Sequence, residues 1–395
     1  MSLRGYLQQL RLKVDARSLS TPFRVVTGNQ SADMDSCVSA IVYSYYNHLY
    51  DNSLMVPLIN IPKADFKLRR DIIKLLEAHS ITEDLLYFHE DLVNLDSADA
   101  KFELSLVDHC NIQGTLLRDL YEAGRVDVVS IIDHHADEDV FTNAKPRIIH
   151  SNGSCSCLVF NYWRDVLREK ALDLEVIAML LGPLLIDTSN FTQKVEQGDI
   201  DAYNLYKQQL QNQDSVWIQK TESETNNSNP FTDFYQQLKA AKKDLSNFSL
   251  SDVLRKDYKQ YKFASGEEVG FSSIGKSLSW IFSTYSGTIE STLSQFLKAH
   301  KLDMIIVTSS YTQKENDQYT REFCYYYQDT SNSKLSNLYN KVKEPLDLNN
   351  NIYKIEKFKK KDLNTEGVLK VYNQANIRAS RKQIVPIVKD ALESQ

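Results

Sequence analysis

The chain has 395 residues and a mass of 45.4 kDa, enough for two domains of ordinary size. With 42% hydrophobic and 25% charged residues it is typical of a globular protein, which excludes a fibrous or largely disordered chain. The formal net charge of −6 argues against a general nucleic-acid binder, and the longest apolar runs, such as 176–186, are too short to span a membrane.

The first half of the chain alternates strand and helix patterns. Apolar strands are predicted at 23–29, 53–62, 85–90, 102–109 and 126–135, and apolar residues at helical spacing predict helices at 34–50, 66–79, 155–170 and 175–190. An amphipathic first helix precedes them within residues 2–20. This alternation predicts an α/β fold: an open, mostly parallel sheet with helices on both faces.

The pattern changes in the second half. Residues 212–230 are polar and rich in Asn and Ser, which indicates a loop or insertion. A helix at 231–245 leads to another that Ser249 or Ser251 can cap. Strands are then predicted at 267–275, 302–312, 321–329, 352–360 and 367–373, with helices near 288–300 and 380–393. We therefore expect domains at 1–245 and 250–395, the second a smaller α/β domain with a mixed sheet.

Acidic and histidine side chains follow apolar runs at four places in the first half. They are Asp33 with Asp35, Asp108 with His109, Asp133 with His134 and His135, and Asp187. Ligands of parallel sheets bind at the carboxyl ends of the strands, so these side chains are expected to converge there. Any one of these acids can instead cap a following helix. Four together favour divalent cations, because unpaired carboxylates at such close quarters would repel each other.

The types of these residues indicate the chemistry. Carboxylates with imidazole suit Mg²⁺, Mn²⁺ or Co²⁺ better than the thiolate-rich sets of structural zinc. Asp33 and Asp35 are two apart, so on a tight turn they can face two neighbouring ions, and a third carboxylate can bridge them. Two ions about 3.5–4 Å apart bind both the attacking and the leaving oxygen in phosphoryl displacement. The sequence therefore predicts hydrolysis of a phosphate compound.

A phosphate substrate requires positive charge, and three segments offer it. Basic residues gather at 63–71, which includes Arg69 and Arg70, at 255–263 and at 376–386. Solvated helix faces explain such charge runs equally well. The turn at 151–156 opens a predicted helix, so its backbone N–H groups can hold an anion, although ordinary capping gives the same sequence.

The order of these segments resembles the DHH phosphoesterase superfamily, which is named after a motif of the Asp133-His134-His135 type. The second half resembles the DHHA2 domain of family II inorganic pyrophosphatases, prune-type proteins and fungal exopolyphosphatases. The likeness covers residues 22–393 and is greatest to the fungal cytosolic exopolyphosphatases. The segments that carry it are 28–36, 66–71, 156–163, 184–190, 254–263 and 380–386.

The resemblance implies a role for each matching position. The implied metal ligands, with Asp108 as the bridge, are Asn29, Asp33, Asp35, Asp108, His134 and Asp187. The implied catalytic residues are His135, Asp108, Lys259 and Arg381, with His135 serving the leaving oxygen. The implied substrate-binding residues are His135, Ser154, Lys259, Arg378, Arg381 and Lys382. Pyrophosphatases have histidine where this chain has Asn29, and a neutral oxygen there should relax the preference for softer ions.

These implications lead to one expected function and two alternatives. We expect an exopolyphosphatase, in which two divalent cations (Mg²⁺ or Mn²⁺, with Co²⁺ possible) activate the water that attacks the terminal phosphorus of inorganic polyphosphate. The active site is expected between the domains, with Arg69 and Arg70 guiding the rest of the polymer. A family II type pyrophosphatase and a prune-like interaction scaffold with weak activity are the alternatives.

The setting of the protein is also an expectation. The five cysteines are odd in number and lack the usual disulfide or zinc spacing, so reduced thiols and a cytoplasmic location are expected. No secretory signal opens the chain, and a minor mitochondrial pool is left open because residues 2–20 resemble a presequence weakly. Beyond the polyphosphate substrate we expect no nucleic-acid or membrane partner, and a monomer by family likeness.

Overall fold

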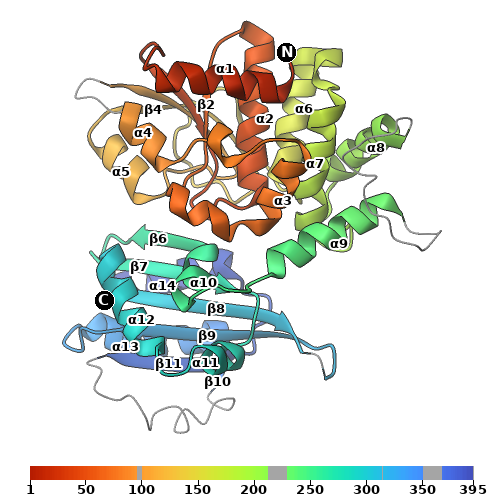
Figure 1. Cartoon of the computed structure of the whole chain (residues 1–395). Coiled ribbons are helices and arrows are strands. Elements are labelled where there is room, and N and C mark those ends of the chain that lie inside the picture. Colours follow the sequence, from red (N-terminus) through yellow and green to blue (C-terminus); the bar gives the residue numbers. More distant parts are fainter. Residues whose placement is uncertain (96–99, 212–228, 314, 350–366, 395) are drawn as a thin grey trace. The chain divides into compact units, whose positions relative to one another are not determined.

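The computed structural model describes residues 1–95, 100–211, 229–313, 315–349 and 367–394 (Figure 1). It divides the chain into two compact units, Met1–Asp244 and Leu245–Gln395, each with its own hydrophobic core. The predicted strand at 352–360 and nearly all of the predicted insertion at 212–230 lie outside the described residues.

The first unit is built on a parallel sheet, as predicted. Its described strands lie in the order β2-β1-β3-β4-β5, and all neighbours are parallel. The strands are β1 (Phe23–Thr27), β2 (Val56–Leu58), β3 (Phe102–Val107), β4 (Val126–Asp133) and β5 (Arg147–Ile149). The middle strands are short apolar runs because helices cover them, and parallel sheets are normally buried in this way.

The helices of this unit pack on the sheet or on one another. They are α1 (Leu3–Asp15), α2 (Met34–Asp51), α3 (Arg70–Ala78), α4 (His89–Leu95), α5 (Thr115–Glu122), α6 (Cys155–Leu167), α7 (Leu174–Asp187), α8 (Gln197–Gln211) and α9 (Pro230–Lys243). Short 3-10 turns are η1 (Lys63–Leu68), η2 (Glu83–Leu85) and η3 (Arg168–Ala171). Helix α2 contacts β1, β2 and β3 and also α6 and α7. It is buried on all sides from Met34 to His48, which explains why apolar and small polar side chains are found all around it.

The second unit contains a mixed sheet. Its described strands lie in the order β10-β11-β9-β8-β7-β6, and only β7 and β8 pair in parallel. The strands are β6 (Tyr258–Lys262), β7 (Glu268–Ile274), β8 (Met304–Thr312), β9 (Tyr319–Tyr327), β10 (Leu348–Asn349) and β11 (Val368–Gln374). The helices are α10 (Leu250–Lys256), α11 (Leu278–Thr284), α12 (Ile289–His300), α13 (Ser333–Leu346) and α14 (Arg381–Glu393). Ser249 caps α10 with a capping box.

Strand β8 shows why this sheet is apolar on both faces. Met304 and Ile306 belong to the core that includes Leu335 of α13 and Ile384 of α14. Ile305 and Val307 instead belong to the core formed with α10, α11 and α12. Since successive side chains of a strand point to opposite faces, a strand covered on both sides buries consecutive residues, here the apolar run Met304 to Val307.

Two predicted elements differ from the structure. The strand predicted at 85–90 is absent from these described residues: only Tyr87 forms an isolated bridge, with Leu58, and α4 begins at His89. In segment 255–263 the helix ends at Lys256 and the chain continues as strand β6, so Lys259 and Lys262 do not lie on a helix face. A polar strand at the end of a sheet carries too little apolar alternation to be recognised from sequence.

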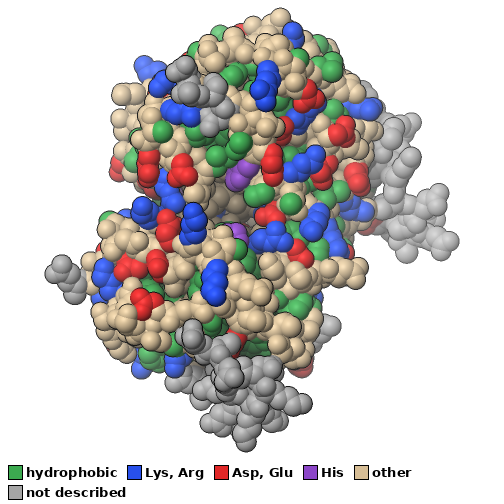
Figure 2. Space-filling view, turned by 60° about the vertical axis from the view of Figure 1, so that its left-hand side comes forward, with side chains coloured by type: hydrophobic (Ala, Val, Ile, Leu, Met, Phe, Trp, Pro, Cys, Tyr) green, Lys and Arg blue, Asp and Glu red, His purple; other side chains and the backbone are tan. Residues whose placement is uncertain are grey.

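The surface carries charged side chains of both signs. Lys and Arg side chains are interspersed with Asp and Glu side chains on the face drawn in Figure 2. In the described part of the chain, no helix is both long and apolar enough to cross a membrane.

Candidate active site

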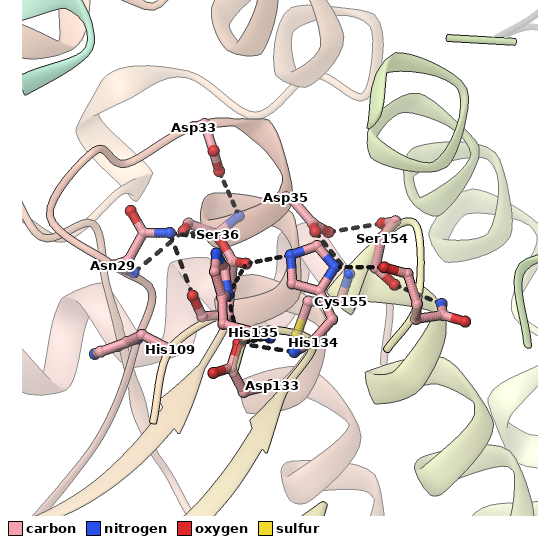
Figure 3. Close-up of polar contacts among 12 residues, drawn as sticks. Asn29, Asp33, Asp35, Ser36, His109, Asp133, His134, His135, Ser154 and Cys155 are labelled. Atoms are coloured by element: carbon pink, nitrogen blue, oxygen red, sulfur yellow. Dashed lines mark hydrogen bonds and ion pairs between the residues drawn. The ribbon is translucent and has the colours of Figure 1, made fainter. Parts of the chain in front are cut away.

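The candidate site lies at the carboxyl ends of β1, β3 and β4, which are neighbours in the sheet (Figure 3). Asp108 follows the last residue of β3 and takes a left-handed backbone conformation, with φ of 63°. Its backbone N–H donates to Ile132 O of β4 at 3.0 Å, which holds this conformation. Asp133 is the last residue of β4. The sheet therefore brings two predicted acids together at one edge.

Asp108 is the centre of the group. Ser36 Oγ donates to its Oδ2 at 2.6 Å, and Asn29 Nδ2 donates to the same oxygen at 2.7 Å. Its Oδ1 lies 3.1 Å from His134 Nε2 and 3.6 Å from His135 Nδ1. Burial alone would raise the pKa of Asp108, but the hydrogen bond from His134 and the charge of both histidines outweigh it and hold this pKa well below its usual range.

Each of the two histidines has one ring nitrogen fixed by an acceptor. His134 Nδ1 donates to Asn152 O at 3.0 Å, and His135 Nδ1 donates to Asp133 Oδ1 at 2.7 Å. The same Asp133 oxygen accepts from the backbone N–H groups of both histidines. Such acceptors set the tautomer of a histidine, so in the neutral rings it is Nε2 that carries the lone pair.

The other carboxylates come from helix ends. Asp33 caps α2 by accepting from Ser36 N at 3.0 Å. Asp35 is buried and accepts from Ser154 Oγ, Cys155 N and Ser156 N at 2.7, 2.6 and 2.8 Å. Burial and then the charge of Asp108 raise the pKa of Asp35 to about 6. Asp187 ends α7, and burial followed by the charge of Asp35 raises its pKa well above the usual value.

These residues fit a divalent cation. Asp108, His134 and His135 each offer one ligand atom, and these atoms lie within 4.8 Å of one another. The bare Nε2 of neutral His134 would repel Asp108 Oδ1 at 3.1 Å unless a proton or a cation lies between them. Asp133 Oδ2 is buried without a hydrogen-bond partner among the described residues. Burial first and carboxylate repulsion second raise the pKa values of Asp35 and Asp187, and a bound cation would offset both effects. Oxygen and imidazole donors together suit divalent metals.

Asn29 and Ser154 differ from their expected roles. Asn29 directs its NH₂ group to Asp108, while its Oδ1 accepts from Ser31 N at 2.8 Å, so its oxygen is not presented as a ligand. Ser154 was expected to bind substrate, but its side chain is fully buried and its hydroxyl donates to Asp35. The expectation for Ser154 is therefore corrected: it supports a carboxylate instead of contacting phosphate.

The turn at 151–156 does hold anions, but both are side chains of the protein. The backbone N–H groups of Cys155 and Ser156 donate to Asp35, and those of Gly153 and Ser154 donate to Asp199. Sequence reasoning missed Asp199, because it lies in helix α8, which the sequence pattern did not predict. It also missed Ser36 and Asn152, whose partners are distant in sequence.

The side chains of Arg69 and Arg70 both have partners within the first unit. Arg69 is 3% exposed and donates to the carbonyl groups of Ser31 and Ala32. It therefore fixes the loop before Asp33, in which Ala32 has a φ of 44°. Arg70 forms an ion pair with Asp244. The interpretation of Arg69 as a polymer guide is wrong, because its guanidinium group is buried and engaged with the backbone.

The second unit holds the predicted basic residues. Arg381, the first residue of α14, donates to Asp257 Oδ1 at 2.6 Å and to Asp257 O at 3.0 Å. Asp257 stands two positions before Lys259, which lies on β6 and is largely buried. Arg381 is thus fixed to the segment that carries Lys259. Arg378 and Lys382 are exposed side chains.

Comparisons with known proteins agree with these features. The model of the DHH family N-terminal domain matches residues 24–184, and the DHHA2 domain model matches residues 236–391. A Schizosaccharomyces pombe protein, provisionally described as an exopolyphosphatase, is 33% identical over 404 residues, which cover 99% of this chain and 96% of the relative. The manganese-dependent inorganic pyrophosphatase of Methanothrix thermoacetophila is 25% identical over 73% of this chain and 82% of its own.

A solved structure shares the fold. It is a Methanococcus jannaschii protein provisionally described as a family II inorganic pyrophosphatase, with a TM-score of 0.55 and 17% identity, and the match covers 94% of this chain and 99% of that one. Both domain models match in the order that the two units follow along the chain. The chain therefore belongs to the DHH phosphoesterase family, with an N-terminal DHH domain followed by a DHHA2 domain.

Proposed function

We propose that this phosphoesterase hydrolyses the terminal phosphoanhydride bond of inorganic polyphosphate and releases orthophosphate. The observation that carries the proposal is the group centred on Asp108, in which a carboxylate and two oriented imidazoles meet at the sheet edge. The polymer as substrate is supported by the Schizosaccharomyces pombe relative, whose description is that of an exopolyphosphatase.

Two divalent cations, Mg²⁺ or Mn²⁺, would be held by Asp33, Asp35, Asp108, His134 and Asp187. When bound, such ions supply the positive charge that lowers the pKa of water and neutralises phosphate oxygens. The chain prepares their places beforehand: Ser36 and Asn29 fix Asp108, Asn152 fixes His134, and the turn at 154–156 fixes Asp35. Ligands held in this way need little rearrangement on binding.

His135 is the residue that we propose for the leaving oxygen. Asp133 accepts from its Nδ1, so Nε2 is the ring atom that can give a proton to the departing phosphate. Asp133 is fully buried and also stabilises the imidazolium form electrostatically. Lys259, Arg378, Arg381 and Lys382 would bind the non-bridging oxygens, where developing charge needs compensation.

A direct assay tests this function. Orthophosphate release is measured from long-chain polyphosphate and from pyrophosphate, each with Mg²⁺, with Mn²⁺ and with a chelator. We expect metal-dependent release from the polymer and little from pyrophosphate. The reverse preference would make the protein a pyrophosphatase, as its Methanothrix relative is named. No release from either substrate by folded, metal-loaded protein would refute hydrolysis and favour the scaffold alternative.

The thiols support the proposed cytoplasmic location. All five cysteines are free and buried, and free thiols persist in reducing compartments.

A further inference from the structure

A buried acid outside the proposed ligand set organises the candidate site. Asp199 lies in the first turn of α8 and has no exposed surface. Its Oδ1 accepts from Asn152 Nδ2 at 2.7 Å and from Ser154 N at 3.1 Å. Its Oδ2 accepts from Gly153 N at 2.7 Å and from Glu196 N at 2.9 Å. A buried carboxylate is costly unless it is hydrogen-bonded, so Asp199 and these donors hold one another in place.

The turn that Asp199 holds serves two proposed metal ligands. Asn152, whose side chain donates to Asp199, accepts from His134 Nδ1 through its backbone carbonyl group. Ser154, whose backbone donates to Asp199, donates to Asp35 through its hydroxyl group. One carboxylate is therefore linked, through a single intervening residue in each case, to both His134 and Asp35.

The packing around this junction leaves little room for movement. A Cβ atom on Gly153 would lie 2.4 Å from Lys194 O and 2.7 Å from Asp199 Oδ2. A Cβ atom on Gly198 would lie 2.7 Å from Asn152 Oδ1. Real Cβ atoms essentially never lie this close to non-bonded atoms, so glycine at both positions lets the turn and the start of α8 approach each other. The position of α8 thus sets the position of the turn.

We propose that Asp199 is a positioning residue for metal binding, which acts by fixing the turn at 152–156 against Asp35 and His134. The inference rests on the proposed metal-dependent function and adds a residue to which that function assigns no role. Outer partners of metal ligands typically contribute about 10- to 100-fold to metal affinity. A residue that only stabilised the fold would lower the melting temperature without changing metal affinity in the folded protein.

The test is Mn²⁺ binding to Asp199→Asn, measured by titration calorimetry without substrate. Asn keeps the size of the side chain but turns an NH₂ group toward a backbone N–H donor, so part of the turn loses its acceptor. We expect Mn²⁺ affinity about 10- to 100-fold lower than wild type, and activity that saturating Mn²⁺ restores. The control is Asp201→Asn in the same helix, where the exposed carboxylate accepts from Gln197 Nε2 at 2.8 Å.

Each result decides the proposal. Wild-type Mn²⁺ affinity in folded Asp199→Asn, or an equal loss in Asp201→Asn, would overturn it while leaving the proposed function intact. Wild-type protein that bound no Mn²⁺ would overturn both. If Asp199→Asn does not fold, Gly198→Ala moves the same turn without removing the charge; weakened Mn²⁺ binding is then expected, and unchanged binding would refute the positioning role.

Discussion

The acidic site of the first unit and the basic residues of the second unit are built in opposite ways. Asp108 and Asp35 are almost fully buried, and each is fixed by several hydrogen bonds. Two cations of the second unit are more exposed: the Arg381 side chain is 16% exposed and pairs with Asp257, and Lys382 lies at the surface, whereas Lys259 is largely buried. Carboxylates repel each other, so the fold must hold them together before any cation arrives. Exposed basic side chains are not crowded in this way, so the fold need not hold them in one fixed arrangement.

The change with the largest expected effect removes the charge at the centre of the acidic site. Asp108→Asn keeps a residue type that tolerates the φ of 63°, so its effect is not confounded by backbone strain. We expect orthophosphate release to fall at least about 1,000-fold, because one carboxylate serves both the cation site and His134. Circular dichroism should show an intact fold.

The control for that variant is Asp127→Asn, at the exposed beginning of the same strand β4, which should keep wild-type activity. Near wild-type hydrolysis by folded Asp108→Asn would show that the acidic site is not the reacting centre. The difference between the two units would then have no bearing on hydrolysis.

Removing a cation of the second unit should have a smaller effect of another kind. Arg381→Ala should lower kcat/KM about 10- to 100-fold, the value of one or two charged hydrogen bonds to phosphate, while Mn²⁺ affinity stays unchanged. Steady-state kinetics and calorimetry measure the two quantities separately. Lys389→Ala, on the same helix, is the matched control. Loss of metal binding in Arg381→Ala would contradict the assignment of metal binding to the first unit and phosphate binding to the second.

The smallest expected effect concerns the acid that holds Arg381. Asp257 is 43% exposed, and ion pairs of this exposure contribute less than about 1 kcal/mol. Asp257→Asn should therefore lower kcat/KM only about 2- to 5-fold, through a less ordered Arg381. An increase in kcat/KM would mean that Asp257 competes with phosphate for the guanidinium group. The fold would then hinder phosphate binding by Arg381 instead of orienting this side chain for it.

The two regions also differ in how much of them could be predicted. Asp108 and His135 could be located from sequence because buried apolar strands end beside them, and the carboxyl edge of a parallel sheet is where ligands bind. The resemblance to the DHH family and the mixed sheet of the second domain were also confirmed. Periodicity and motif order carry this information without any knowledge of tertiary contacts.

The supporting residues could not be predicted, for a physical reason. The hydrogen bond from Gly153 to Asp199 spans 46 positions, and that from Asn29 to Asp108 spans 79. The turn at 151–156 showed that backbone N–H groups were available for an anion, but no sequence pattern indicated which anion they bind. Ser154 was therefore assigned to the substrate, when the nearest negative charge is that of Asp35.

Each unit contains a buried cysteine whose reaction with a thiol reagent can report local unfolding of that unit. A thiol reagent attacks an accessible thiolate, and burial raises the pKa of Cys324 to about 12 and that of Cys155 well above its usual value. Modification consequently proceeds through transient local unfolding. Cys324 lies in β9 of the second unit, whereas the other four cysteines belong to the first. The rate at which each thiol reacts therefore records how often its own unit opens, separately for the two halves of one native chain.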